Sequence, residues 1–305
     1  MLFKIVPYFD KDRTYAIRGI CMLMIMASHI PLVLGTNSTF FSRYLIGWGY
    51  IATGVFFFLS GFGLYMSLTS KKTLLVSWLI VKLKKLIYPF IFAFFCYCLL
   101  ALFLDRNIFK LDLFKQLISF TIPGTTTWFF KVILGLYILT WLVFRTNKSN
   151  AQKVAIICIC SFIYFITARH ILNLEDFWSK SVLNFPLGMI FGLLHKRIIP
   201  SPKFEMLYLW GAFLVYIYAK FKFEPWITSL CFSLLCIQLA SLVNIDNTFL
   251  RYIGKESINF YLFQLIFMHF ISILTQSWFI FVPIYFLLTY ILSWVYTFLD
   301  KRINI

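Results

Sequence analysis

The amino-acid sequence predicts an all-α integral membrane protein, a bundle of about ten transmembrane helices with both termini in the cytoplasm. Apolar residues make up 61% of the 305 residues and charged residues only 13%, and the mean hydropathy is +0.86. A soluble domain is about half apolar and about a quarter charged. The apolar residues also occur in long runs, and the charged residues gather in the short segments between them.

Ten apolar runs are each long enough to cross about 30 Å of hydrocarbon as a helix. We place these spans at 14–34, 45–69, 74–104, 127–144, 152–168, 179–195, 205–221, 225–243, 256–275 and 277–299. The third run is too long for one straight crossing, so we expect it to begin as a basic amphipathic stretch at the membrane surface. There is no internal repeat or separate soluble domain, and we treat residues 1–305 as one transmembrane domain. Any chemistry must then be performed by residues on or between the helices.

The distribution of lysine and arginine predicts the orientation of the bundle. If the N-terminus is cytoplasmic, 18 of these residues fall in cytoplasmic segments and 8 in outer segments. This excess follows the positive-inside rule, and an even number of helices returns the C-terminus to the cytoplasm. The same rule accounts for the formal net charge of +17, so we expect no nucleic-acid partner.

Neither the cysteines nor the histidines form a metal-binding pattern. The seven cysteines include no CxxC pair and lie mostly inside apolar runs, which is typical of small buried apolar residues. The four histidines are scattered, without HxxxD or HEXXH spacing. We therefore predict no metal site.

The first span contains two ionisable residues, Arg18 and His29. Such side chains are costly inside a membrane unless they are paired or hydrated, so they indicate a functional site by default. Their spacing puts them about 20° apart around a helix and about 16 Å apart along it, so they share one face. In the functional interpretation, Arg18 is a cation for phosphate near the cytoplasmic surface and His29 is a base deeper in the bilayer. In the alternative, Arg18 extends to the surface and His29 bonds to a neighbouring helix, and the spacing leaves both open.

Other polar residues have simpler explanations. Three cations at helix ends are expected to extend toward the membrane surface: Lys131, Arg145 and Arg169. Two histidines at span boundaries are expected in solvated loops: His170 and His195. An acidic pair is expected in a solvated turn, with contact to a sugar as the alternative: Glu175 and Asp176.

Several glycines are expected to allow close helix packing rather than to bind phosphate, because no strand–helix GxGxxG context exists: Gly54, Gly61 and Gly63. The stretch FPLGMIFG at 185–192 predicts an interrupted helix. The interruption is explained either by a packing kink or by a break that lines a cavity.

Five stretches of the chain carry recognisable motifs in order. They are RGICMLMIMASH (18–29), VFFFLSGFGL (55–64), WLIVKLKKLIYPF (78–90), TTWFFKVILGLY (126–137) and YIGKESINFYLFQ (252–264). These stretches resemble helix motifs of the acyltransferase-3 family of membrane O-acyltransferases. The first resembles its Arg and His pair with ten residues between them, and the third its basic pair before a proline. The resemblance spans about 14–265, and it implies a helical membrane enzyme.

The resemblance has two departures near its basic residues. The family often has an Asp three residues before the motif Arg, where this chain has Tyr15, and Asp12 is a candidate substitute. The basic pair is commonly arginine, whereas here it is Lys82 and Lys85. Lysine still attracts phosphate but lacks the bidentate geometry of arginine.

A third departure concerns the catalytic base. The family's ninth-helix motif often ends in His, whereas this chain has Gln264. His269 lies five residues further on and would point elsewhere on a helix. His29 is therefore the stronger candidate base.

The resemblance implies transfer of an acetyl group from cytoplasmic acetyl-CoA to a hydroxyl of an extracytoplasmic glycan. The phosphates of acetyl-CoA need cations, and the candidates on the inner side are Arg18, Lys82, Lys84 and Lys85. His29, with Arg18 as the second catalytic candidate, would either take the proton of the acceptor hydroxyl or carry the acetyl group transiently. Candidate donors to the oxyanion are Ser28, Ser60 and Trp128. Candidate substrate-binding residues are Ser60, Trp128, Tyr261 and Gln264.

The leading functional hypothesis is a multi-pass O-acetyltransferase of a bacterial inner membrane that modifies capsule, O-antigen or another exported polysaccharide, or its lipid-linked precursor. One alternative is a transporter of a lipid-linked or nascent glycan, for which no acetyl group would depend on the protein. Another is a scaffold of a polysaccharide assembly complex, in which neither Arg18 nor His29 would matter singly.

Overall fold

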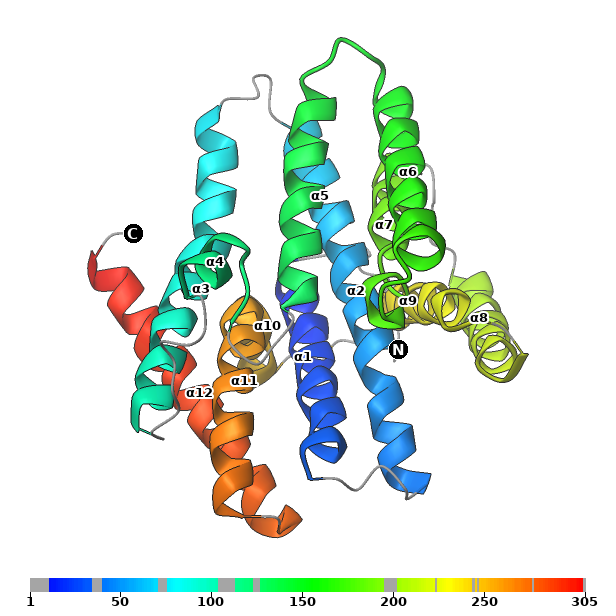
Figure 1. Cartoon of the computed structure of the whole chain (residues 1–305). Helices are drawn as coiled ribbons and strands as arrows, with labels where there is room; N and C mark the ends of the chain where they lie inside the picture. Colours follow the sequence, from blue (N-terminus) through cyan, green and yellow to red (C-terminus); the bar gives the residue numbers. More distant parts are fainter. Residues whose placement is uncertain are drawn as a thin grey trace.

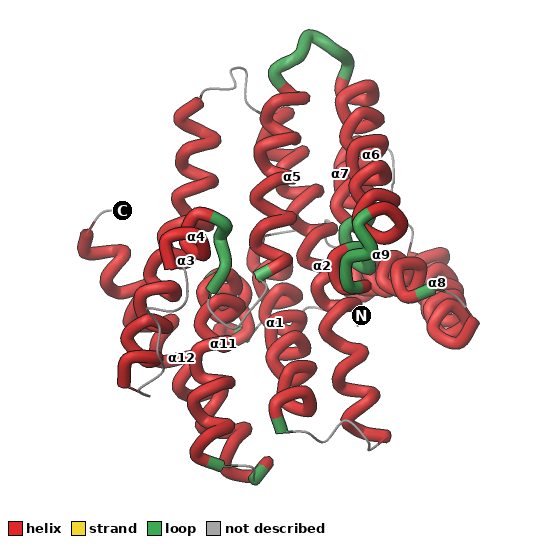
Figure 2. The backbone as a smooth tube through the Cα atoms, viewed as in Figure 1, coloured by secondary structure: helices red, strands yellow, loops and turns green. Residues whose placement is uncertain are grey.

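The computed structural model describes residues 11–34, 40–70, 76–103, 113–122, 127–194, 202–222, 224–242, 245, 247–275 and 277–303. Across these ranges every regular element is a helix and no strand occurs (Figure 2). The α-helices are α1 (Lys11–Val33), α2 (Phe40–Thr69), α3 (Val76–Phe103), α4 (Leu113–Ile118), α5 (Trp128–Phe144), α6 (Asn150–Ile166), α7 (Asn184–Leu194), α8 (Pro202–Lys222), α9 (Pro225–Leu242), α10 (Thr248–Lys255), α11 (Ser257–Leu274) and α12 (Trp278–Ile303). A π-helical turn η2 (Thr167–Ile171) and a 3₁₀ turn η3 (Asp176–Trp178) follow α6.

The predicted all-α membrane class is confirmed. Six helical segments in the described ranges are long and apolar enough to cross a membrane: Lys11–Val33, Leu45–Thr69, Val76–Phe103, Asn150–Ile171, Ser257–Leu274 and Trp278–Arg302. Three shorter helices are also apolar: Trp128–Phe144, Asn184–Leu194 and Pro225–Ala240. Each of the ten predicted spans coincides with one helix, whereas the short helices α4 and α10 were not predicted. The number of crossings and the cytoplasmic placement of both termini stay predictions.

The long helices form a bundle in which α1 lies between α2 and α11 (Figure 1). Helix α7 packs on α2, and α10 packs on α1. Helices α3 and α12 lie at one edge of the view, and α8 and α9 project from the opposite edge. The chain thus surrounds α1, which carries Arg18 and His29, with helices from the rest of the sequence.

Glycines allow α2 and α7 to touch through their backbones. A Cβ atom at Gly61 of α2 would lie 2.1 Å from the Phe185 carbonyl oxygen, and one at Gly188 of α7 would lie 2.0 Å from the Phe58 oxygen. Only glycine permits so close an approach. The packing interpretation is thereby confirmed for Gly61. At Gly63 no atom lies within 4 Å of the position of a Cβ, so for that glycine the packing interpretation is wrong.

The 185–192 stretch is explained by packing. Pro186 lies in the first turn of α7, where a missing N–H costs nothing. Gly188 and Gly192 face α2, the latter against the Tyr65 ring. The alternative of a cavity-lining break finds no support, because no residue of this stretch borders the cavity of the candidate site.

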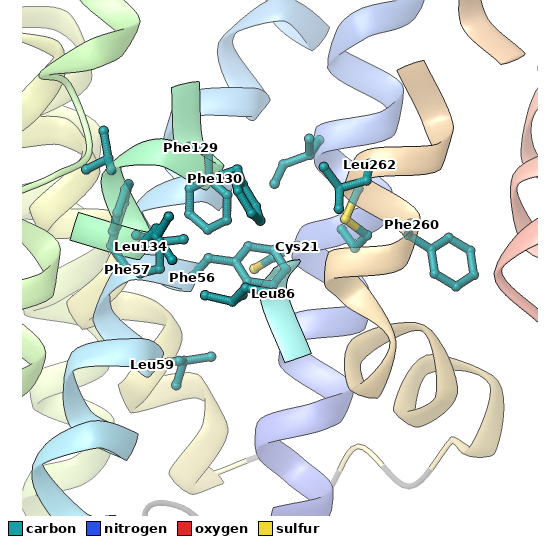
Figure 3. Close-up of a cluster of buried hydrophobic side chains, with 14 of the residues drawn as sticks. Cys21, Phe56, Phe57, Leu59, Leu86, Phe129, Phe130, Leu134, Phe260 and Leu262 are labelled. Atoms are coloured by element: carbon teal, nitrogen blue, oxygen red, sulfur yellow. The ribbon is translucent and has the colours of Figure 1, made fainter. Parts of the chain in front are cut away.

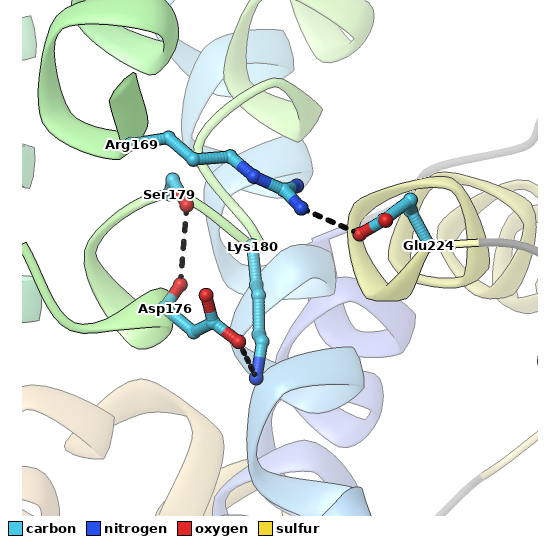
Figure 4. A network of polar contacts seen from close by, with 5 residues as sticks. All are labelled: Arg169, Asp176, Ser179, Lys180 and Glu224. Carbon is cyan, nitrogen blue, oxygen red and sulfur yellow. Dashed lines mark hydrogen bonds and ion pairs between the residues drawn. The ribbon is translucent and has the colours of Figure 1, made fainter. Parts of the chain in front are cut away.

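A polar contact joins η2 to the start of α9, and separate local contacts surround Asp176 of η3 (Figure 4). Arg169 donates to the Glu224 carboxylate at 2.7 Å, and Lys180 pairs with Asp176 at 3.1 Å. Arg169 therefore does not simply extend toward the membrane surface as predicted, because a carboxylate from the α8–α9 junction meets it. Exposed pairs of this kind contribute about 0.2–1 kcal/mol each.

The other residues predicted to lie at the surface have different outcomes. Arg145 and His170 are exposed, as expected. Lys131 is not extended to the surface, because its ammonium group donates to the Thr121 hydroxyl at 2.8 Å and lies over the Trp178 ring. His195 and the side chain of His269 lie outside the described residues.

Candidate active site

A cavity of about 630 Å³ opens among α1, α2, α3, α5, α10, α11 and α12. Six cationic side chains border it: Arg18, Lys82, Lys84, Lys85, Lys255 and Lys301. Only two carboxylates, Glu256 and Asp300, lie on its wall. The excess of four positive charges makes the cavity a site for a polyanion.

Helix α3 supplies three of the cations. Lys82 and Lys85 lie three residues apart and therefore on one helix face, one turn before Pro89, which also borders the cavity. The Lys82 ammonium group lies 5.7 Å from the centroid of the Trp78 ring, and that of Lys84 lies 5.7 Å from the Tyr88 ring. Lys84 and Lys85 are exposed, so these charges stay hydrated without a ligand and lose little by being there.

Helix α1 lines the cavity with one continuous stripe of side chains. Its lining residues are Tyr15, Arg18, Met22 and Ile25, which recur at the three- and four-residue spacing of a single helix face. His29 occupies the next position of the same stripe. Because α1 is one helix over Lys11–Val33, the shared face of Arg18 and His29 follows from their spacing, although of the two only Arg18 borders the cavity.

Arg18 has no ion-pair or hydrogen-bond partner among the described residues, and its Nε atom is buried. Asp12, the candidate substitute for the missing carboxylate, pairs instead with Arg251 at 3.3 Å. A partly buried guanidinium without a counter-ion is costly. The arrangement therefore favours an anion from outside the chain as the partner of Arg18.

The α10–α11 junction supplies a second wall of charge that the sequence analysis missed. A Cβ atom at Gly254 would lie 1.7 Å from the Tyr15 carbonyl oxygen, so α10 crosses α1 in backbone contact. This crossing brings Lys255 and Glu256 to the cavity beside α1. Asn259 donates to the Glu256 carboxylate at 2.9 Å. Burial raises the pKa of Glu256, and the neighbouring Lys255 lowers it in part.

Three aromatic side chains line one part of the cavity, its aromatic end: Phe56, Phe129 and Tyr261. Phe56 and Phe129 also belong to the buried cluster in Figure 3. The Phe129 ring, near the start of α5, lies 6.2 Å from Phe56 and 5.3 Å from Tyr261 between ring centroids. The Tyr261 hydroxyl is hydrogen-bonded to the Phe129 main chain. Ser60 of α2 is 8% exposed and also borders the cavity. The structure thus brings two of the predicted substrate-binding residues, Ser60 and Tyr261, to one end of one cavity.

His29 lies one helical turn beyond the part of α1 that lines the cavity. The last lining residue of α1 is Ile25, four residues before His29, and Tyr261 of α11 lies three residues before Gln264. The His29 imidazole is within hydrogen-bonding reach of the Gln264 side chain. The two predicted residues therefore meet each other, although neither borders the cavity.

Two other predicted residues lie away from the cavity wall. Ser28 donates its hydroxyl proton to the Ile25 carbonyl oxygen at 2.7 Å, so that proton is not available to an oxyanion. Trp128 packs against Phe57 and Phe177, with ring centroids 6.3 and 5.8 Å away. Of the three predicted oxyanion donors, Ser60 is the one that borders the cavity.

The sequence missed Lys255, Lys301 and Tyr285. The Tyr285 hydroxyl donates to the Gln264 Oε1 atom at 2.9 Å. The two lysines were counted only as evidence of orientation, and the position of Lys255 after the α10 glycine was the available signal. Nothing in the apolar run of α12 distinguishes Tyr285 from its neighbours.

The arrangement fits a two-part reaction path. The cationic mouth can hold the phosphates of a donor, the aromatic end can enclose an extended apolar arm, and His29 is a base placed beyond that end. No group of three His, Cys, Asp or Glu side chains that could hold a metal occurs within the described ranges.

Comparison with known proteins gives one match. The family model of the acyltransferase domain, acyltransferase 3, matches residues 12–298. No curated protein and no solved structure matches the chain.

Proposed function

Because the chain belongs to the acyltransferase 3 family, we propose that it is an O-acetyltransferase that transfers acetyl from acetyl-CoA to a hydroxyl of a cell-surface or exported polysaccharide. The observation that carries this proposal is the cationic cavity whose α1 stripe ends one turn before His29. Family membership makes the protein a membrane acyltransferase. The acetyl group, the CoA donor and the glycan acceptor belong to the proposal.

The donor occupies the cavity with its phosphates on the lysines of α3 and on Arg18. Arg18 contributes most per contact, because its Nε atom is buried and lacks a hydrogen-bond partner in the described part of the chain. Lys255 and Lys301 complete the cationic wall from the opposite side. The thioester arm then extends toward Phe129 and the aromatic end, which excludes water from the reacting bond.

His29 supplies the proton chemistry. In direct transfer, the imidazole takes the proton of the acceptor hydroxyl, the new ester C–O bond forms, the C–S bond of the thioester breaks, and the proton passes to the departing thiolate. In the second route, His29 first accepts the acetyl group from the thioester and then passes it to the hydroxyl. Both routes develop an oxyanion, for which the Ser60 hydroxyl is the candidate donor.

The orientation assigns the two substrates to opposite sides. With the lysine-rich segments in the cytoplasm, the cavity mouth receives the cytoplasmic donor. His29 lies farther along α1, toward the outer side from which a glycan or its lipid-linked precursor arrives. The location that we propose for this enzyme is a bacterial inner membrane.

Membranes that contain the protein test the proposal when they are supplied with acetyl-CoA labelled in its acetyl group and with lipid-linked or surface glycan. The expected result is label in alkali-labile ester linkage on the glycan, absent with membranes that lack the protein. A transporter predicts altered movement of glycan across the membrane without label, and that result would replace the proposal. A scaffold predicts that single substitution of Arg18 or His29 alters neither the label on the glycan nor the movement of glycan across the membrane.

A further inference from the structure

We propose that Gln264 and Tyr285 are positioning residues, which orient the His29 imidazole and select the ring nitrogen that carries its proton. The inference rests on the proposed role of His29. It assigns to Gln264 a role other than substrate binding, and it adds Tyr285, which lies 21 residues from Gln264 in the sequence.

Both residues are sealed inside the bundle. Gln264 of α11 and Tyr285 of α12 are each 0% exposed. Neither borders the cavity, so neither side chain meets the donor there. A buried amide and a buried phenol are costly unless they bond to each other or to a third group. The Tyr285 hydroxyl does donate to Gln264 Oε1 at 2.9 Å.

The third group is His29. Gln264 Nε2 and His29 Nδ1 are both buried and both lack a hydrogen-bond partner in the described chain, although the two side chains lie within hydrogen-bonding reach. An amide can donate from its nitrogen or accept at its oxygen, and a neutral imidazole has one nitrogen of each kind. Oε1 has a second lone pair besides the one that accepts from Tyr285, so a small rotation of either side chain lets it accept from Nδ1–H as well.

The amide orientation determines the chemistry available to His29. If the amide oxygen faces the ring, Nδ1 carries the proton and Nε2 has a free lone pair, which a base requires. If the amide nitrogen faces the ring, Nε2 carries the proton and can only donate. Because the Tyr285 hydroxyl donates to Oε1, it holds this oxygen as the acceptor for the ring, and the second lone pair of Oε1 selects the tautomer with the proton on Nδ1 and a free lone pair on Nε2.

Removing a single hydroxyl tests this role. In Tyr285→Phe the ring and its packing remain, but the amide loses its anchor and samples both orientations. We expect kcat to fall about tenfold, the factor that corresponds to one ordinary hydrogen bond, whereas KM for acetyl-CoA stays within about twofold of wild type. Gln264→Met, which keeps length but removes both polar atoms, should lower kcat further. Tyr290→Phe removes a hydroxyl from the same helix without a bond to Gln264 and should leave kcat unchanged.

The tautomer itself is measured by nitrogen NMR of histidine-labelled protein in bilayers, with the His29 signal assigned by its loss in His29→Ala. Wild type should show one neutral tautomer, and Tyr285→Phe a mixture. A single unchanged tautomer together with wild-type kcat in Tyr285→Phe would overturn the inference. If Tyr285→Phe does not accumulate in membranes, Gln264→Met carries the same test. If wild type transfers no acetyl group, the proposed function fails, while the NMR comparison still decides whether Tyr285 and Gln264 orient His29.

Discussion

Substituting Arg18 with methionine should stabilise the unliganded protein and at the same time weaken its binding of the donor. The two effects have opposite signs because Arg18 has no partner among the described residues, while its Nε atom is buried. A paired structural arginine would lose stability on the same substitution.

The magnitudes follow from the contacts. An unsatisfied buried donor costs about 1–3 kcal/mol, and because the Arg18 side chain is only partly buried, we expect the lower end, about 1 kcal/mol. That gain corresponds to a rise in Tm of about 1.5 °C, at an unfolding entropy of about 2.1 cal/mol/K for each of the 305 residues. The lost charge-assisted bond to phosphate is worth about 1.5–3 kcal/mol, which raises the Kd for CoA by about 10- to 150-fold.

The assay uses protein in lipid nanodiscs, with thermal unfolding for stability and calorimetric titration for CoA binding. Arg13→Met is the matched control on the same helix, because the Arg13 guanidinium donates to the Ala240 carbonyl oxygen at 3.0 Å. The control should lower Tm and leave CoA affinity within about twofold of wild type. A lower Tm in Arg18→Met, or an unchanged CoA affinity, would refute the assignment of Arg18 to an external anion.

Three further substitutions test other parts of the structure. Gly254→Ala places a Cβ atom 1.7 Å from a backbone oxygen of α1, so it should lower both the abundance of the protein in membranes and its binding of CoA. Gly63→Ala, where the position of the Cβ atom is open, should change neither. Equal membrane abundance of the two variants would contradict the backbone contact between α10 and α1. Lys85→Gln should raise KM for acetyl-CoA by severalfold at low ionic strength and by less at about 1 M salt, because Lys85 is exposed and its field is screened; a KM ratio independent of salt would argue against a through-solvent charge effect. Burial raises the pKa of Glu256, so the folded state binds the proton of this carboxyl group more tightly than the unfolded state does, and the resulting stability is present at low pH and lost as the pH rises through the folded pKa. Glu256→Gln should therefore raise Tm at about pH 8 and not at about pH 4. The reverse pattern would mean that the folded protein stabilises the charged carboxylate.

The sequence predicted the helices well where the physics is local. A run of apolar residues long enough to cross a bilayer must satisfy its backbone as a helix, and each of the ten predicted spans contains one. Helix α10 was not predicted, because it has only eight residues. It is held by the backbone contact of Gly254 with Tyr15, which lies more than 200 positions earlier in the sequence.

The site was predictable only along single helices. Spacing placed Arg18 and His29 on one face of α1, and of the two only Arg18 borders the cavity. Spacing cannot show where the cavity ends, because its aromatic end is built by rings from three other helices, among them Phe129 and Tyr261. Asp12 illustrates the same limit, since its partner Arg251 lies 239 residues away.

The sequence could not predict that Tyr285 is the buried partner of Gln264, for a related reason. Tyr285 lies in an apolar run that composition assigns to lipid or packing. Its polar role arises because α12 folds back on α11 and places one hydroxyl opposite one amide.

The most direct test of the account compares wild type with His29→Ala in a host that lacks the protein, with O-acetyl groups on the surface glycan measured by NMR. His170→Ala, which changes an exposed histidine, is the matched control at equal membrane abundance. The account predicts O-acetyl signal with wild type and with His170→Ala, and its loss with His29→Ala. Equal O-acetylation in all three strains would contradict a catalytic role for His29, and a change in glycan amount without any O-acetyl signal would contradict the acetyltransferase itself.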